Sequence, residues 1–270
     1  MKSGHPYKQY HLARKSAEHE TRGQSWSGDS VEDSIALCSA QTIEPVLVAT
    51  LPRKGKILES GCGLGRWVFY LRRKGFDVTG IELSEPAIQT AFAYDPAVPI
   101  LRDDVLGSSF ADGTFDAAIS LGVVEHFEEG PRQALAELRR LLKTDGILCI
   151  SVPTQNLTRR LVTNRLKELR RRSLQRRGEQ FVFEEYRYTQ KEFSGHLNRA
   201  GFEIVSMVPD DFTPPRNMGL VVDFPFLRHA SRKWELNAAG RILRAGVYCF
   251  SPWWACAGTF WICRKRSEAA

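Results

Sequence analysis

The feature that most restricts the fold of this chain is a regular alternation of short apolar runs with helix-length stretches. Strand-length runs occupy residues 56–60, 77–82, 99–102, 115–120, 147–152 and 202–208, and helical periodicity lies between them, as in 131–143 and 189–200. Strands that alternate with helices in this way form a parallel sheet covered on both faces, with right-handed crossovers. The sequence therefore predicts a doubly wound α/β fold.

The composition fits one elaborated α/β unit rather than two equal domains. Hydrophobic residues make up 43% of the 270 residues and charged residues 26%, which excludes a largely disordered, collagen-like or disulfide-scaffold chain. We expect an N-terminal arm and helix over 1–50, irregular to about residue 30 and kinked or restarted at Pro45. The main domain covers 51–270, with inserts at about 153–188 and 210–258.

Positive charge is concentrated in the first insert. The net charge of the chain is +7, whereas residues 159–177 alone hold nine basic side chains and one acidic side chain. Leucines at 157, 161, 166 and 169 add a rough apolar stripe, which predicts a basic amphipathic helix. Such a helix could cover an active site, bind an anionic acceptor, contact acidic lipid or bind RNA phosphates. The alternative is that its arginines form only the solvated face of a structural helix. The second insert carries Trp253 and Trp254 and is aromatic enough to enclose a hydrophobic substrate.

The six cysteines and the N-terminus favour a cytoplasmic location. No two cysteines form a CxxC pair, and the polar N-terminus has no apolar core of a signal peptide. Residues 245–263 hold no charge over a length that could span a bilayer, but Gly246, Pro252 and Gly258 count against a span. Peripheral contact with an anionic membrane stays open.

A glycine-rich loop follows the first strand, where an open α/β sheet places its ligand. Gly61, Gly63 and Gly65 leave bare backbone for a ligand to approach, and Glu59 offers a carboxylate to a cationic or hydroxylic group. A dinucleotide fold would need its third glycine one residue later. Glu82 ends the second strand, where a carboxylate can accept both hydroxyls of a ribose.

Four motifs in order resemble the class I S-adenosylmethionine-dependent methyltransferases, in particular the group that includes the ubiquinone-pathway O-methyltransferases. They are ILESGCGLGRW, VTGIELSEPAI, DDVLGSSFADGTFDAAISLGVVEHF and LRRLLKTDGILCISVP, within about residues 45–210. The resemblance implies a Rossmann-like seven-stranded sheet, mostly parallel with the last strand antiparallel. Phe202–Val208 and Thr259–Arg264 fit the closing hairpin of that sheet, and S-adenosylmethionine is the implied cofactor.

The resemblance also assigns cofactor contacts to individual residues. They are Glu59, Gly61, Cys62, Gly63 and Gly65 around the methionine and ribose portions, Glu82 at the ribose hydroxyls, Leu83, Asp104 and Val105 at the adenine, and Leu121 and Gly122 beside the methionine.

Glu125 and His126 follow the fourth strand, where a general base for a hydroxyl acceptor would lie. The rival interpretation is that His126 packs or caps beneath the substrate. Glu128 and Glu129 could join this pair around a magnesium ion, but a solvated acidic loop is favoured and no metal is expected. Tyr186 and Tyr188 are candidates to line the acceptor pocket.

The sequence thus predicts an enzyme that moves a methyl group to a small-molecule or lipid-linked acceptor, at oxygen. One alternative is an RNA methyltransferase that uses the arginine-rich insert, although the segment Leu121–Glu125 lacks the Asn/Asp-Pro-Pro-aromatic signature of enzymes acting on exocyclic amines. A second alternative is a non-catalytic scaffold that binds the cofactor. The sequence does not identify the acceptor.

Overall fold

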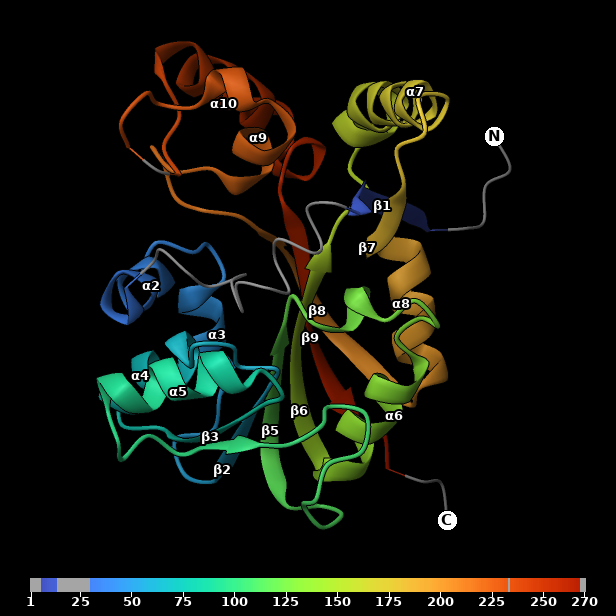
Figure 1. Cartoon of the computed structure of the whole chain (residues 1–270). Coiled ribbons are helices and arrows are strands. Elements are labelled where there is room, and N and C mark those ends of the chain that lie inside the picture. Colours follow the sequence, from blue (N-terminus) through green and yellow to red (C-terminus); the bar gives the residue numbers. More distant parts are fainter. Residues whose placement is uncertain (1–5, 14–29, 233, 268–270) are drawn as a thin grey trace.

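A seven-stranded sheet forms the centre of the molecule (Figure 1), in a computed structural model that describes residues 6–13, 30–232 and 234–267. The spatial order is β4-β3-β2-β5-β6-β9-β8. The strands are β2 (Lys56–Ser60), β3 (Asp77–Glu82), β4 (Ile100–Arg102), β5 (Phe115–Leu121), β6 (Leu142–Pro153), β8 (Phe202–Asp210) and β9 (Gly258–Lys265). Strands β2 to β6 pair in parallel, and β9 is antiparallel to both β6 and β8. The predicted doubly wound sheet with its closing hairpin is confirmed.

Helices cover the sheet on both faces. On one side lie α2 (Val31–Cys38), α3 (Glu44–Thr50), α4 (Arg66–Arg73) and α5 (Glu85–Tyr94), and on the other α6 (Arg132–Leu141) and α8 (Gln190–Arg199). Neighbouring residues of β2 serve the two faces, since Ile57 packs in the first core and Leu58 in the second. This alternation explains the continuous apolar runs of the central strands.

Local sequence signals fix several helix ends. Thr189 and Glu192 form a capping box that starts α8, and Ser30 accepts a hydrogen bond from the N–H of Asp33 at the start of α2. Pro45 lies in the first turn of α3, so the kinked or restarted helix predicted over 31–50 is two helices.

The first insert contains elements that the sequence did not predict. After a π-helical turn, η2 (Arg159–Thr163), and the expected basic helix, α7 (Asn164–Gln175), comes β7 (Phe181–Arg187), which pairs antiparallel with β1 (Tyr7–Leu12). The predicted irregular arm is therefore wrong for β1, while its residues 1–5 and 14–29 lie outside the described part. Strand β1 shows no apolar alternation because backbone pairing with β7 defines it. Side-chain contacts add to this pairing, such as the 3.0 Å hydrogen bond that the Gln9 amide donates to the Glu184 carboxylate.

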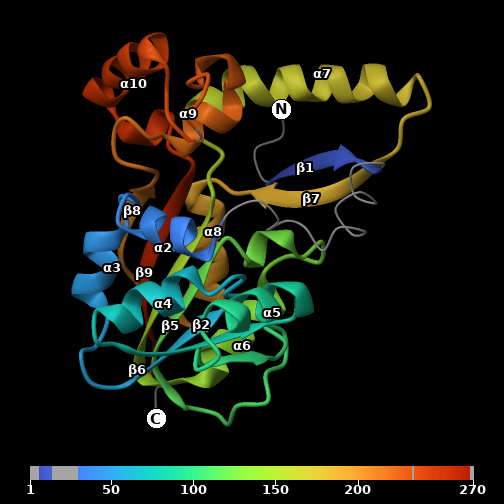
Figure 2. The ribbon, with the colours of Figure 1, turned by 60° about the vertical axis from the view of Figure 1, so that its left-hand side comes forward.

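The second insert has a small core of its own around Leu220, Leu227 and Leu236. It comprises α9 (Met218–Asp223), η3 (Pro225–Leu227), α10 (Ala238–Phe250) and η4 (Pro252–Trp254). The two inserts follow the carboxyl ends of β6 and β8, and Figures 1 and 2 show α7 and α10 at the same end of the molecule. Among the described helices, none has the length and apolar character that crossing a membrane requires.

Candidate functional site

The glycine loop joins β2 to α4 at the carboxyl edge of the sheet. Its first turn is held by the carbonyl oxygen of Ile81, which accepts hydrogen bonds from the N–H groups of Gly61 and Cys62, both 2.9 Å long. Gly61 has a φ of 75°, and a Cβ there would lie 2.7 Å from a methyl group of Val123. Only glycine satisfies both restrictions, so the loop presents backbone rather than side chains.

Glu82 lies against this loop. Its Oε2 accepts a 2.9 Å hydrogen bond from the N–H of Gly63, and its Oε1 accepts from the N–H groups of Leu83 and Ser84. The structure thus brings together the two motifs that the sequence separates by one strand. A carboxylate offers about four lone pairs, so Glu82 must release one of these amides to accept both hydroxyls of a ribose.

Glu59, at the end of β2, has a different environment. Its side chain is buried, and its Oε2 has no hydrogen-bond partner among the described residues. Burial raises the pKa of Glu59 to about 8, against the opposing charge of Arg66. A buried carboxyl with an unused oxygen beside a glycine loop fits an ammonium group such as that of the methionine portion of S-adenosylmethionine.

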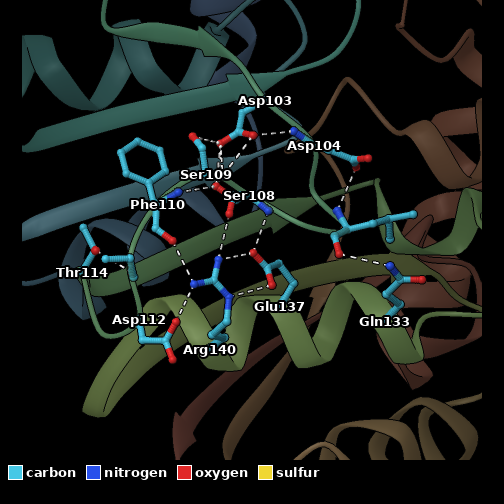
Figure 3. Close-up of polar contacts among 12 residues, drawn as sticks. Asp103, Asp104, Ser108, Ser109, Phe110, Asp112, Thr114, Gln133, Glu137 and Arg140 are labelled. Carbon is cyan, nitrogen blue, oxygen red and sulfur yellow. Dashed lines mark hydrogen bonds and ion pairs between the residues drawn. The ribbon is translucent and has the colours of Figure 1, made fainter.

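The loop after β4 separates the roles of two adjacent aspartates (Figure 3). The Asp103 carboxylate accepts hydrogen bonds from the Ser108 hydroxyl at 2.6 Å and the Ser109 N–H at 2.9 Å, and although burial opposes it these bonds lower the pKa of Asp103. Asp104 accepts one hydrogen bond within the described part of the chain, from the N–H of Leu106. Asp103 therefore holds the loop, and Asp104 keeps the capacity to accept from a ligand.

Arg140 of α6 holds the same loop in place through hydrogen bonds to its backbone. Its guanidinium donates to Glu137 at 2.6 Å, to the Phe110 carbonyl at 2.8 Å and to the Ser108 carbonyl at 2.9 Å (Figure 3). These contacts join α6 to residues 108–110, so they hold the loop that carries Asp104 and Val105 against this helix.

The remaining predicted cofactor contacts lie at the same edge with different exposure. Leu83 is exposed, whereas Val105 is buried. The Cys62 thiol is buried and points toward β3, where a Cβ on Gly80 would lie 2.7 Å from the sulfur. Cys62 therefore offers the ligand side of the loop its backbone and not its side chain. Leu121 ends β5, and the N–H of Gly122 donates to the Ser151 carbonyl at 3.1 Å.

His126 ends the short 3-10 turn η1 (Val124–His126) that follows β5, and its side chain is exposed. Its Nδ1 lies 2.8 Å from the carbonyl oxygen of Glu184 on β7. A carbonyl only accepts, so Nδ1 carries a proton and, in the neutral ring, Nε2 holds the free lone pair. The contact fixes the tautomer that a general base requires.

Glu125 is buried, with 1% of its surface exposed, and its Oε2 has no partner among the described residues. Burial raises the pKa of Glu125 well above its usual value, and the charges of Glu185 and Asp210 add to this. Glu125 therefore favours its neutral form, which can donate a hydrogen bond but does not act as a base.

The ligand atoms of Glu125, His126 and Glu185 lie within 4.8 Å of one another. Glu185 thus takes the place that the sequence offered to Glu128 and Glu129, and Glu128 instead lies 3.6 Å from the Lys8 ammonium. A divalent cation would have to remove the proton of Glu125 and compete with Arg187, which is 2.9 Å from Glu185. The proton on Glu125 and the ion pair of Glu185 with Arg187 therefore count against a bound divalent cation.

Tyr186 and Tyr188 lie in the core beneath η1. The Tyr186 hydroxyl donates to the Glu128 carbonyl at 2.8 Å, and the Tyr188 ring packs against Phe193. This packing supports the turn that carries His126. Contact of either tyrosine with an acceptor stays a prediction.

Asp210 and Gln41 join the site without having been expected. Asp210 ends β8 at the same edge of the sheet, and its Oδ1 accepts a 3.4 Å hydrogen bond from Gln41. Burial raises the pKa of Asp210 to about 6, assisted by Asp211 and opposed by a hydrogen bond from Ser151. An acid directly after a predicted strand was the available signal for Asp210. Gln41 gave none, because the turn between α2 and α3 positions it.

Comparisons with known proteins agree with this geometry. A family model described as a methyltransferase domain matches residues 14–207. The mitochondrial ubiquinone biosynthesis O-methyltransferase of Schizosaccharomyces pombe is 34% identical over 42% of this chain and 43% of that protein. The malonyl-[acyl-carrier protein] O-methyltransferase of Erwinia pyrifoliae is 35% identical over 37% of this chain and 38% of that protein. The chain thus spans less than half the length of these relatives.

Solved structures share the fold at low sequence identity. A methyltransferase of Methanosarcina mazei described as SAM-dependent superposes with a TM-score of 0.56 at 20% identity, covering 83% of this chain and 98% of its own. The [4+2]-cyclase SpnF gives 0.54 at 18% identity, covering 90% and 87%. The fold alone therefore does not determine the chemistry, but the family model covers most of this chain. The chain belongs to the methyltransferase domain family, among the class I enzymes that depend on S-adenosylmethionine.

Proposed function

We propose that this chain transfers a methyl group to an oxygen atom of a small-molecule or lipid-linked acceptor. The observation that carries the proposal is the contact of His126 Nδ1 with the Glu184 carbonyl, since in the neutral ring it places the free lone pair on Nε2 of an exposed side chain. A hydroxyl must lose a proton as it attacks a methyl group, whereas an uncharged amine can lose its proton afterwards. A fixed imidazole base beside the cofactor loop therefore favours oxygen.

The residues of the chain have separate tasks in this reaction. S-adenosylmethionine supplies the methyl group, bound to a positively charged sulfur. The backbone of the glycine loop and the carboxyls of Glu59 and Glu82 hold the cofactor, and His126 Nε2 accepts the proton of the attacking hydroxyl. Burial raises the pKa of Glu125, which lies next to His126, and so favours an uncharged side chain beside the proton acceptor.

The relatives support an oxygen acceptor without identifying it. Two of them carry names that describe O-methylation, one in ubiquinone biosynthesis and one on a malonyl group of acyl-carrier protein, while a third, of Synechocystis, is named for a phytyl hydroquinone. These names cover acceptors with and without a lipid tail, so the proposal extends to both.

Transfer of a labelled methyl group from S-adenosylmethionine tests the proposal. Acceptor pairs should differ only at the reactive atom, for example a catechol and the matching aminophenol, each with and without a prenyl tail. We expect label on the hydroxyl compounds. Preferential labelling of nitrogen would contradict the proposal.

The variant His126→Gln tests the base directly. We expect turnover to fall about 100-fold or more while cofactor affinity is retained, because Gln keeps a polar side chain but accepts no proton. His229→Gln, in the second insert, is the matched control and should leave turnover unchanged. An unaffected rate in His126→Gln would reduce this residue to a structural role.

A further inference from the structure

Helix α7 packs with reversed polarity. The side turned toward the protein carries the half-buried charged residues Lys167, Glu168 and Arg171, whereas Leu166 and Leu169 are 60% and 64% exposed. Surface helices of globular proteins normally turn their apolar stripe inward. The preceding turn continues the exposed stripe with Leu157, Leu161 and Val162.

Buried ion pairs hold α7 in this orientation. Asp223 of α9 lies 2.7 Å from the Arg159 guanidinium and 3.5 Å from that of Arg187, and all three side chains are buried. Lys167 of α7 approaches the same carboxylate at 3.9 Å, and burial together with the charge of Arg187 lowers the pKa of Lys167 to about 8. These ion pairs connect α7 and the preceding turn to the second insert, so the exposed leucines lie on a helix with a fixed orientation.

The second insert exposes large apolar side chains of its own. Ile242 and Phe250 of α10 are 75% and 78% exposed, and the Phe250 ring stacks on Trp254 with centroids 5.8 Å apart. Phe226 and Leu243 are exposed as well. Helix α10 contains no acidic residue and two arginines, of which Arg241 is exposed and Arg244 is buried. Since α7 and α10 lie at the same end of the molecule, the apolar residues of both inserts belong to one end (Figures 1 and 2).

We propose that these two inserts form a docking face for a membrane surface with anionic headgroups. The docking face consists of Leu157, Leu161, Val162, Leu166 and Leu169 in the first insert and of Phe226, Ile242, Leu243, Phe250 and Trp254 in the second. Apolar side chains flanked by arginines match the boundary between acyl chains and negative headgroups, where leucine and tryptophan enter the bilayer and arginine reaches back to phosphate.

Two other occupants fit less well. A second copy of the chain would bring two segments 159–177 together, each with nine basic residues and one acidic residue, and like charges repel. RNA would use the arginines but would leave the exposed leucines in contact with water or phosphate. The proposal goes beyond the methyl transfer itself, since docking does not depend on which acceptor is methylated.

Cosedimentation of the full chain with vesicles tests the proposal. One set is phosphatidylcholine alone, and the other contains about 30 mol% phosphatidylglycerol. We expect binding to the anionic set that weakens as salt rises, and about tenfold weaker binding for the double variant Leu166→Ser/Leu169→Ser. The control double variant Leu101→Ser/Val205→Ser changes exposed apolar residues on the two edge strands and should bind like the wild type.

Other results would overturn the proposal. One is that the wild type cosediments equally with both vesicle sets. Another is that the double variant Leu166→Ser/Leu169→Ser cosediments with anionic vesicles as strongly as the wild type. A dimer in sedimentation velocity that dissociates in the leucine variant would make this face an interface between copies. A gel shift with bulk RNA that Arg165→Gln/Arg176→Gln abolishes and the leucine variant retains would assign the face to RNA. Vesicle binding is measured without S-adenosylmethionine, so failure of methyl transfer does not affect it.

Discussion

At the scale of single residues, the site depends on three carboxyls in unlike surroundings. Glu82 accepts hydrogen bonds from three backbone amides, whereas Glu59 and Glu125 are buried and each has an oxygen without a partner among the described residues. The sequence could predict that Glu59 and Glu82 lie beside the glycine loop, because each lies at the end of a strand at the carboxyl edge of the sheet. It could not predict that burial raises the pKa of Glu125, because burial of this side chain depends on the packing of β7 against η1.

Glu82→Gln should weaken S-adenosylmethionine binding by about 1.5 to 3 kcal/mol, because a charge-assisted acceptor becomes a neutral one. Isothermal titration calorimetry measures the change. Glu85→Gln is the control, since Glu85 is an exposed acid three residues further along the chain and pairs with Arg102 at 3.8 Å. Equal affinity of the wild type and Glu82→Gln would refute the ribose assignment.

Glu59 should make the stability of the cofactor-free protein depend on pH. Its folded pKa of about 8 lies above the ordinary value of 4.5, so the native state binds a proton that the unfolded state releases. The stabilisation is complete below pH 4.5 and is lost as pH rises through about 8, by about 3 to 5 kcal/mol. Urea unfolding of the wild type and Glu59→Gln between pH 5 and 9 measures this loss. The same change of the free energy of unfolding with pH in both proteins would contradict the prediction, because the amide that replaces the carboxyl has no proton to lose between pH 5 and 9.

At the scale of secondary structure, the sequence predicted the strands and helices that carry an apolar pattern or a capping signal of their own. It missed the two strands, β1 and β7, that are defined by pairing with each other. The central strands are continuous apolar runs, and the sequence predicts their ends to within two residues, except that β6 begins at Leu142, five residues before the predicted run 147–152. Strand β7 contains Phe181, Val182, Phe183 and Tyr186, residue types that favour strands, but the basic helix before it was the stronger signal. Strand β1 carried no such signal, since backbone pairing with β7 and polar side-chain contacts, such as that of Gln9 with Glu184, hold it in place.

Asp223→Ala should destabilise the fold by about 3 to 5 kcal/mol, because it leaves the buried guanidinium groups of Arg159 and Arg187 without their shared carboxylate. Denaturant unfolding measures the change, and Asp223→Asn, which keeps an oxygen acceptor, should lose less. Glu32→Gln breaks the exposed pair with Arg73 and should barely move the unfolding midpoint. Similar midpoints for Asp223→Ala and Glu32→Gln would show that the buried network does not hold the inserts.

At the scale of the whole molecule, the methyltransferase sheet and the two inserts differ in how they are stabilised. The sheet has two apolar cores, one on each face, whereas the first insert is held by ion pairs and by the β1–β7 ribbon. The fold is shared with a cyclase of different chemistry, so the inserts at the carboxyl edge, not the sheet, are where acceptor and location would be specified.

This division predicts two levels of amide hydrogen exchange. Amides of β5 and β6 are enclosed by both cores and should exchange only on global unfolding, while amides of α7, whose side chains are mostly exposed, should exchange at least about 100-fold faster through local opening. Exchange followed by mass spectrometry resolves the two segments. Anionic vesicles should slow exchange in α7 and α10 and leave β5 and β6 unchanged, because a membrane-bound helix opens less often than a hydrated one. Exchange in α7 as slow as in β6 without vesicles would contradict the two levels, and protection of β5 instead of α7 would place lipid contact elsewhere.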